Sequence, residues 1–169
     1  MDPIARARDL CLDEESAFGC AEGAYAALQE YFELSDTSNS TEAMALNGGI
    51  GYSGGTCGAL IGAALTLGRL AGIRLAERPQ AKRVARGLLQ KLMADFAAEF
   101  GSTQCRELTG FDLVSDHDAF LASGVWETGC QAQIEFAIKQ LAPLTSHKAW
   151  DAALVGIAAA EPSELPEAG

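Results

Sequence analysis

The feature that most constrains the fold is the helical spacing of apolar residues through the first hundred positions. Phe18, Tyr25, Leu28 and Phe32 are separated by seven, three and four positions, which puts them on one face of a helix. No segment shows the strict apolar–polar alternation of a half-buried strand over a useful length. The sequence therefore predicts an all-α fold.

The expected long helices cover residues 13–33, 57–73, 79–100, 130–141 and 146–160, with brief helices after Thr41 and near Ser115. Pro79 suits a first helical turn, and Gly101 suits the C-cap of the same helix. We expect a single-domain bundle of six or seven helices over residues 1–160. Residues 161–169, which include two prolines, are expected to form a flexible C-terminal tail.

Composition narrows the classes of partner. The chain carries a net charge of −11, which disfavours nucleic acid and anionic membrane surfaces. The longest uncharged apolar stretch, residues 57–68, falls short of the roughly 20 residues that span a bilayer. Residues 1–9 lack the hydrophobic run of a secretory signal. We therefore expect a cytoplasmic protein with reduced thiols and no membrane contact.

A glycine-rich segment, residues 47–55, holds five glycines in nine positions and is called the glycine loop below. Its spacing spells a dinucleotide fingerprint, but no strand precedes it, so no nucleotide is expected. Glycines also let backbone N–H groups approach an anionic group closely. On that basis Gly49, Gly51, Gly54 and Gly55 are predicted to contact a cofactor; the alternative is a tight connection between helices.

Four cysteines stand in well-separated segments beside glycine or helix-starting residues. We call Cys20, Cys57, Cys105 and Cys130 the four-cysteine set. Three of them follow residues suited to N-caps, at positions 56, 102–103 and 128. A thiolate in the first turn of a helix is favoured by free N–H groups and by the helix dipole. We therefore predict that Cys57 and Cys105 are more acidic than an ordinary thiol. The alternative is that these cysteines are small core residues.

The remaining cysteine and the histidines are given no part in this site. Cys11 has neither a glycine nor a cap beside it and is interpreted as a packing residue or a spare thiol outside the site. The odd number of cysteines argues against a fully paired disulfide framework. His117 and His147 lie in unrelated segments, which supports neither zinc-finger spacing nor c-type haem attachment.

The motifs together resemble a known family. They are Gly19-Cys20-Ala21, Gly55-x-Cys57-Gly58-Ala59-x-x-Gly62, Cys105-Arg106-Glu107-Leu108 and Cys130. This set resembles the redox-active proteins named for a C-GCAxxG-C-C cysteine pattern, over about residues 10–142. The first motif departs from that name, since one residue stands between Ala21 and Gly23. The family is similar to the carboxy-terminal part of split-Soret cytochromes c, where an iron–sulfur centre occurs; their haem-binding half has no counterpart here, so haem is not expected.

Three functions follow from these observations. In the first, the four-cysteine set converges and holds a metal or an iron–sulfur cluster, most simply [2Fe–2S], that transfers electrons. In the second, a metal-free protein uses the same cysteines for thiol–disulfide chemistry or sulfur transfer. In the third, the chain is a helical interaction protein with inert thiols. The expected partner is a redox protein or a small-molecule substrate, and a homodimer is compatible with the sequence.

Overall fold

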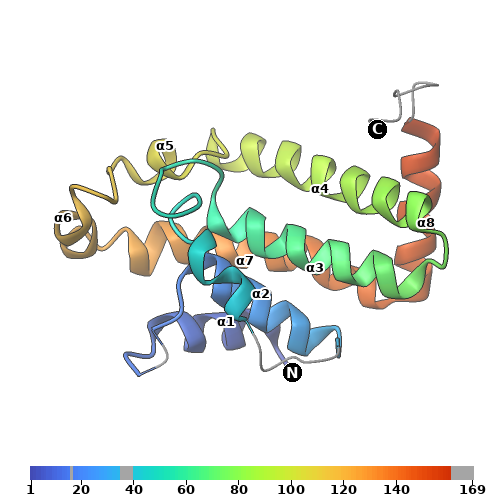
Figure 1. Cartoon of the computed structure of the whole chain (residues 1–169), viewed down its shortest axis with the longest axis horizontal. Coiled ribbons are helices and arrows are strands. Elements are labelled where there is room, and N and C mark those ends of the chain that lie inside the picture. Colours follow the sequence, from blue (N-terminus) through green and yellow to red (C-terminus); the bar gives the residue numbers. More distant parts are fainter. Residues whose placement is uncertain (16, 35–39, 161–169) are drawn as a thin grey trace.

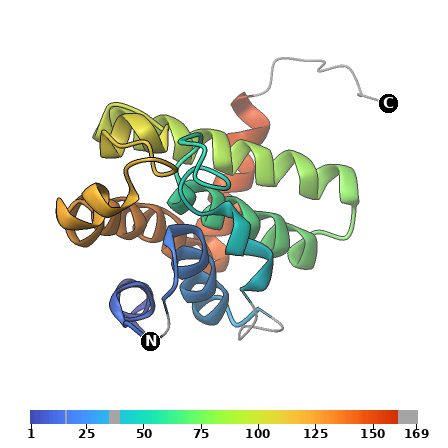
Figure 2. The same cartoon turned by 60° about the vertical axis from the view of Figure 1, so that its left-hand side comes forward.

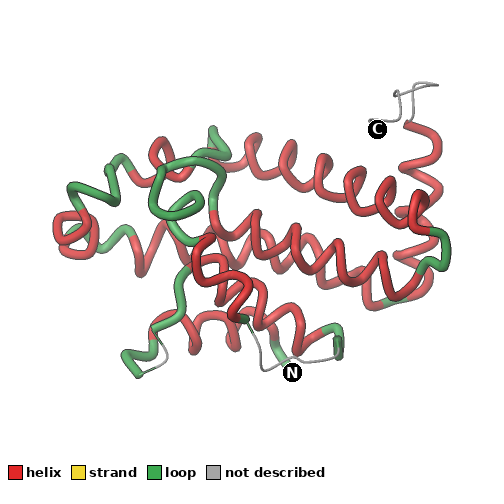
Figure 3. The backbone as a smooth tube through the Cα atoms, viewed as in Figure 1, coloured by secondary structure: helices red, strands yellow, loops and turns green. Residues whose placement is uncertain are grey.

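A computed structural model of the chain describes residues 1–15, 17–34 and 40–160. Within these ranges the fold is all-α, as predicted, and contains no strand (Figure 3). The elements in chain order are α1 (Pro3–Leu12), α2 (Cys20–Tyr31), η1 (Thr41–Leu46), α3 (Gly58–Arg74), α4 (Arg78–Phe100), α5 (Cys105–Thr109), α6 (His117–Ala122), η2 (Trp126–Cys130), α7 (Gln131–Leu141), η3 (Ala142–Thr145) and α8 (His147–Ala160). The predicted tail over 161–169 lies outside the described residues.

Three helices form the long body of the molecule. Helices α3, α4 and α7 pack along the longest axis, while α1 and α2 cover one side (Figures 1 and 2). Helix α8 packs against α4 at one end, and α5 and α6 lie at the opposite end beside the glycine loop. The fold therefore places the cysteine-bearing segments at the end away from α8.

Small residues let α2 and α3 pack closely. A Cβ atom on Gly62 of α3 would lie 2.6 Å from the Ala21 carbonyl oxygen of α2, so this crossing requires glycine. Ala24, Ala27 and Ala63 are fully buried in the core. The alanine- and glycine-rich composition thus sets the separation between the two helices that flank the site.

The helix boundaries agree with the sequence in the middle of the chain and differ at its start. Gly101 ends α4 with a φ of 83°, as predicted for a C-cap glycine. The helix expected over 13–33 is wrong in its first part, because α1 ends at Leu12 and α2 begins only at Cys20. Asp13 is the C-cap of α1 and not the N-cap of the next helix.

Candidate thiol site

A short antiparallel pairing brings Cys57 and Cys105 to the same place. The Cys57 N–H donates to the Thr103 carbonyl at 2.8 Å, and the Cys105 N–H donates to the Gly55 carbonyl at 2.6 Å. This pairing joins the end of the glycine loop to the segment after α4. Both cysteines stand at the beginning of a helix, as the N-cap of α3 and the first residue of α5. Two residues 48 positions apart in sequence thus become neighbours.

The glycine loop winds in the left-handed region. Every residue from Gly48 to Tyr52 has a φ between 58° and 76°, a conformation that glycine adopts most readily. The N–H groups of Gly51, Gly54 and Gly55 donate to carbonyls within or just before the loop. These three amides are therefore used to hold the loop's own shape.

Cys20 begins α2 and points toward the start of α3. A Cβ atom on Gly58 would lie 2.2 Å from the Cys20 sulfur, so the sulfur fills the space that a side chain at position 58 would need. Burial raises the pKa of the Cys20 thiol, while N–H groups of Gly48, Ala21 and Gly58 that face the sulfur oppose this rise. Backbone N–H groups from three different segments thus face the Cys20 sulfur.

Cys130 reaches the same region from the other side. It ends η2, a turn of π-helix that runs directly into α7, and its N–H donates to the Val125 carbonyl at 3.0 Å. The N-cap expected at Thr128 does not form, because the helix has already begun at Trp126 and the Thr128 hydroxyl donates to the Gly124 carbonyl. π-turns inside helices are frequent at functional sites.

These segments enclose one cavity of about 310 Å³, which we call the thiol cavity. Cys20, Cys105 and Cys130 line it. Its other lining residues are Cys11, Ala17, Phe18, Gly19, Asn47, Gly48, Tyr52, Thr109, Leu113, His117, Phe120, Leu121 and Trp126. Three residues of the glycine loop line the cavity, namely Asn47, Gly48 and Tyr52. The glycines predicted to contact a cofactor do not line it; these are Gly49, Gly51, Gly54 and Gly55.

Cys57 is not among the residues that line the thiol cavity. Its thiol donates a hydrogen bond of 3.3 Å to Gln133 Oε1 on α7. Burial raises the pKa of the Cys57 thiol well above its ordinary value, and negative charge on Cys20, Cys105 or Cys130 would raise it further. The Cys20 sulfur lies against Gly58, the residue after Cys57, and the backbone pairing keeps Cys57 beside Cys105, so the whole four-cysteine set shares one region of the molecule.

The prediction that Cys57 and Cys105 are unusually acidic is wrong for the metal-free protein. Burial raises the pKa of the Cys105 thiol to about 11, and it raises that of Cys130 to about 12. The N–H groups of Cys57 and Cys105 donate to backbone carbonyls, and the Ala59 N–H, which faces the Cys57 sulfur, only partly opposes the effect of burial on the Cys57 pKa. Desolvation therefore outweighs the position at a helix N-terminus.

The prediction that Cys11 lies outside the site is also wrong, because Cys11 lines the thiol cavity. Burial raises the pKa of the Cys11 thiol to about 12, and negative charge on Cys20 raises it as well. Sequence reasoning also gave no role to His117, whose ring lies 5.6 Å from that of Tyr52 at the cavity wall. Neither residue stands in a local motif, so no pattern identified them.

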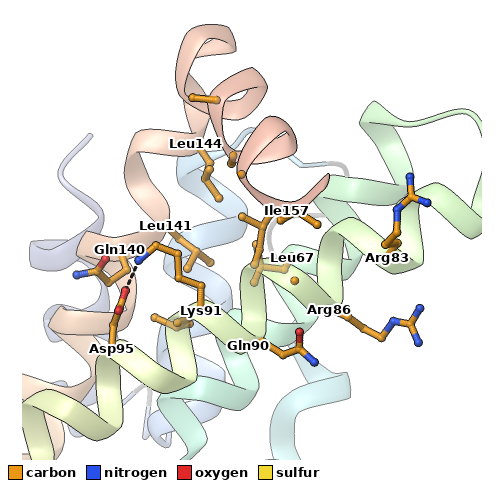
Figure 4. Close-up of a pocket in the computed structure, with 16 residues that line it drawn as sticks. Leu67, Arg83, Arg86, Gln90, Lys91, Asp95, Gln140, Leu141, Leu144 and Ile157 are labelled. Carbon is orange, nitrogen blue, oxygen red and sulfur yellow. Dashed lines mark hydrogen bonds and ion pairs between the residues drawn. The ribbon is translucent and has the colours of Figure 1, made fainter. Parts of the chain in front are cut away.

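A larger cavity of about 700 Å³ lies at the other end of the molecule, between α4, α7 and α8 (Figure 4). Apolar side chains such as Leu141, Leu144 and Ile157 form its interior, while Lys91 at its edge pairs with Asp95. No cysteine lines this cavity. The cysteines that line a cavity therefore lie at the end that carries α5 and α6.

Residues 1–15, 17–34 and 40–160 contain neither a preformed site for a single metal ion nor a helix that could span a membrane. No group of three or more His, Cys, Asp or Glu side chains in these ranges is arranged to hold a single metal ion. None of the helices in the same ranges has the length and apolar character needed to cross a bilayer.

Comparison with known proteins places the chain in a family. Searches of curated proteins and of solved structures find no match. A family model described as "Putative redox-active protein (C_GCAxxG_C_C)" matches residues 18–144. That segment includes the whole four-cysteine set and excludes Cys11. Since the match covers more than half of the sequence, the chain belongs to the C_GCAxxG_C_C family of redox-active proteins.

Proposed function

We propose that this protein binds an iron–sulfur cluster, most simply [2Fe–2S], through the four-cysteine set and transfers electrons. The observation that carries this proposal is the gathering of Cys20, Cys57, Cys105 and Cys130 from four separate segments around one end of the fold. Independent core residues would have no reason to meet in this way. Four cysteine thiolates are also the usual ligand set of such clusters.

The surroundings of the sulfurs support a cluster. Cysteines that bind a cluster surround several iron and sulfide ions, so they stand around a space, as three of the four-cysteine set do around the thiol cavity. The N–H groups of Gly48, Ala21 and Gly58 face the Cys20 sulfur. Hydrogen bonds to cluster sulfurs are one of the means by which proteins set the reduction potential.

Each group at the site has a role in this proposal. When bound, the cluster supplies the one-electron chemistry. Phe120 and Trp126 cover the cavity wall and limit the access of water, which also influences the potential. The Gln133 oxygen accepts a hydrogen bond from the Cys57 thiol and holds it in place, and binding of a metal by Cys57 would release this proton to solvent. The partner is a redox protein or a small molecule, and the proposed location is the cytoplasm.

Anaerobic reconstitution tests the proposal. Reduced protein is incubated with ferrous iron and sulfide, desalted, and analysed for bound iron, acid-labile sulfide and the paramagnetic resonance of the reduced form. We expect stoichiometric iron and sulfide in the unmodified protein. Cys57→Ser, Cys105→Ser and Cys130→Ser should each bind substantially less cluster.

Cys11→Ser is the matched control, because it makes the same change in the same cavity outside the four-cysteine set. It should retain the cluster. A protein that binds neither iron nor sulfide under these conditions would contradict the proposal. Equal loss of cluster in Cys11→Ser and Cys57→Ser would contradict the assignment of the four ligands.

A second function, thiol–disulfide chemistry in the metal-free protein, is favoured by one specific observation. Cys11 lines the cavity together with Cys20, Cys105 and Cys130, although it lies outside the segment that matches the family. A thiol that a cluster does not use is free to react with one that the cluster releases.

A further inference from the structure

Cys11 lies outside the segment that matches the family but lines the same cavity as Cys20. It lies on α1, before the segment that matches the family, and its side chain is 95% buried, with 5% exposed. Its thiol donates a weak hydrogen bond of 3.8 Å to the carbonyl oxygen of Gly19, the residue directly before Cys20. One peptide unit separates that oxygen from the Cys20 Cα, so the Cys11 sulfur lies within about 7 Å of this Cα atom.

The face of α2 next to Cys20 is shaped to accept this sulfur. Gly23 lies three positions after Cys20, which places the two residues on the same side of the helix. A Cβ atom on Gly23 would lie only 2.1 Å from the Cys11 sulfur. The absence of a side chain at position 23 therefore brings the Cys11 sulfur against the turn of helix that begins with Cys20.

A buried hydrogen-bond donor lies beside Cys11. Gln131 is 5% exposed, and among the described residues its Nε2 has no hydrogen-bond partner. The Gln131 side chain lies where its amide would donate to a Cys11 thiolate, which lowers the Cys11 pKa against the larger effect of burial. An unsatisfied buried amide costs stability, and a thiolate on Cys11 would satisfy this donor.

We propose that Cys20 and Cys11 form a thiol–disulfide exchange pair, in which partly exposed Cys20 is the attacking thiol and buried Cys11 the resolving thiol. This inference rests on the proposed redox function and applies when the cluster is absent. The substrate class is a low-molecular-weight disulfide that enters the thiol cavity.

The reaction is balanced by the two protein thiols and one small disulfide. The Cys20 thiolate attacks the small disulfide, forms a mixed disulfide and releases the first small thiolate. The Cys11 thiolate, held by the Gln131 N–H, then attacks the Cys20 sulfur and releases the second small thiolate. The protons of Cys20 and Cys11 pass through solvent to these two leaving groups. Two electrons thus move from the protein to the small disulfide.

Disulfide mapping on metal-free, reduced protein tests this pair directly. The protein is treated anaerobically with one equivalent of glutathione disulfide, its remaining thiols are blocked, and it is digested with trypsin and a glutamate-specific protease. Cleavage after Arg, Lys and Glu puts every cysteine on a separate peptide, namely 9–14, 16–22, 43–69, 100–106 and 128–135. We expect peptide 9–14 to be joined to peptide 16–22, with release of two glutathione molecules.

Variants separate the two steps. In Cys11→Ser, Cys20 should carry a persistent glutathione adduct and no internal disulfide should form. Gln131→Met should slow the release of the second glutathione about tenfold, because a hydrogen bond to a charged sulfur is lost. Gln140→Met is the control, since Gln140 lies on the same helix, is exposed and lines only the cavity at the other end of the molecule. It should leave the second step unchanged.

Two results would overturn the pair. One is a disulfide that joins Cys20 to Cys105 or Cys130 while Cys11 stays reduced. The other is equal slowing of the second step by Gln131→Met and Gln140→Met. Circular dichroism of each variant shows whether it is folded, and Cys11→Ala provides a second test should Cys11→Ser unfold. Since the assay contains no iron, these results are independent of cluster loading in the reconstitution experiment, whose failure would contradict the proposed function alone.

Discussion

Asn47 joins the glycine loop to α2 through the buried carboxylate of Glu22. Its Nδ2 donates to Glu22 Oε2 at 2.8 Å, and its Oδ1 accepts from the Ala21 N–H at 2.9 Å. The same Glu22 oxygen accepts from the Gly19 N–H at 3.1 Å, which caps the start of α2. One amide side chain therefore fixes the cavity wall relative to the first residue of α2, Cys20.

Asn47→Asp should weaken this junction. The substitution removes the donor to Glu22 and sets a second carboxylate against it in a poorly hydrated place, so we expect the free energy of unfolding to fall by about 2 kcal/mol. Urea denaturation of the reduced, metal-free protein measures the change. Gln90→Glu, the equivalent change at an exposed position of α4, is the control. Similar losses in both variants would show that the Asn47 hydrogen bonds contribute little.

The stability of the metal-free protein should depend on pH in the alkaline range. Burial raises the pKa of Cys105 from 9.0 to about 11, so the folded state holds this proton more tightly than the unfolded state. The corresponding stability is fully present below about pH 9 and is lost as the pH rises toward 11. Thermal denaturation of reduced protein across this range should show the loss.

The variant Cys105→Ser separates the effect of the Cys105 thiol from that of other groups that lose a proton in the alkaline range. One such group is Tyr25, whose pKa is raised by burial and by Glu42. The variant should lose less stability between pH 9 and 11 than the unmodified protein does. Identical pH dependence in the two proteins would mean that Cys105 titrates as an ordinary exposed thiol.

Local patterns in the sequence predicted the long helices but missed one break. Apolar spacing and the signals at Pro79 and Gly101 located α3, α4 and α7 closely, because these depend on neighbouring residues. The spacing from Phe18 to Phe32 ran across the true start of α2 and concealed the break before Cys20. The Gly19 N–H bonded to Glu22 is the signal that marks this start.

The thiol site was only partly predictable, since long-range packing builds it. The sequence predicted the four-cysteine set as the site, and the structure brings three of its members, Cys20, Cys105 and Cys130, to one cavity. That these cysteines carry the function stays a prediction. The meeting of Cys57 with Cys105 depends on a pairing between distant segments that no local pattern encodes. The position of Cys11 depends on how α1 packs against α2. The residue in the sequence that reflects this packing is Gly23, because a side chain there would clash with the Cys11 sulfur.

The geometry of the glycine loop gives a third prediction, which compares two of its residues. Gly49 and Gly51 both have positive φ, but a Cβ atom on Gly49 would lie 2.4 Å from the Gly55 nitrogen, whereas Gly51 faces open space. Gly51→Ala should therefore cost only the left-handed strain, about 1 to 2 kcal/mol. Gly49→Ala should cost clearly more and reduce cluster binding, as urea denaturation and iron analysis would show. Equal costs would contradict the packed loop.

The close approach of α3 to Cys20 gives the last prediction. In Gly58→Ala the new methyl group would lie 2.2 Å from the Cys20 sulfur and 3.0 Å from the Ala21 nitrogen, so the sulfur must move away from the N–H groups that ring it. We expect loss of stability and of both cluster binding and the Cys11–Cys20 disulfide.

Gly68→Ala is the control on the same helix, because nothing lies within 4 Å of its added methyl group. It should stabilise the protein by about 0.5 to 1 kcal/mol, through the better helix propensity of alanine, and leave the thiol chemistry unchanged. A Gly58→Ala protein that binds iron and forms the disulfide as well as Gly68→Ala does would show that the Cys20 sulfur does not need this position.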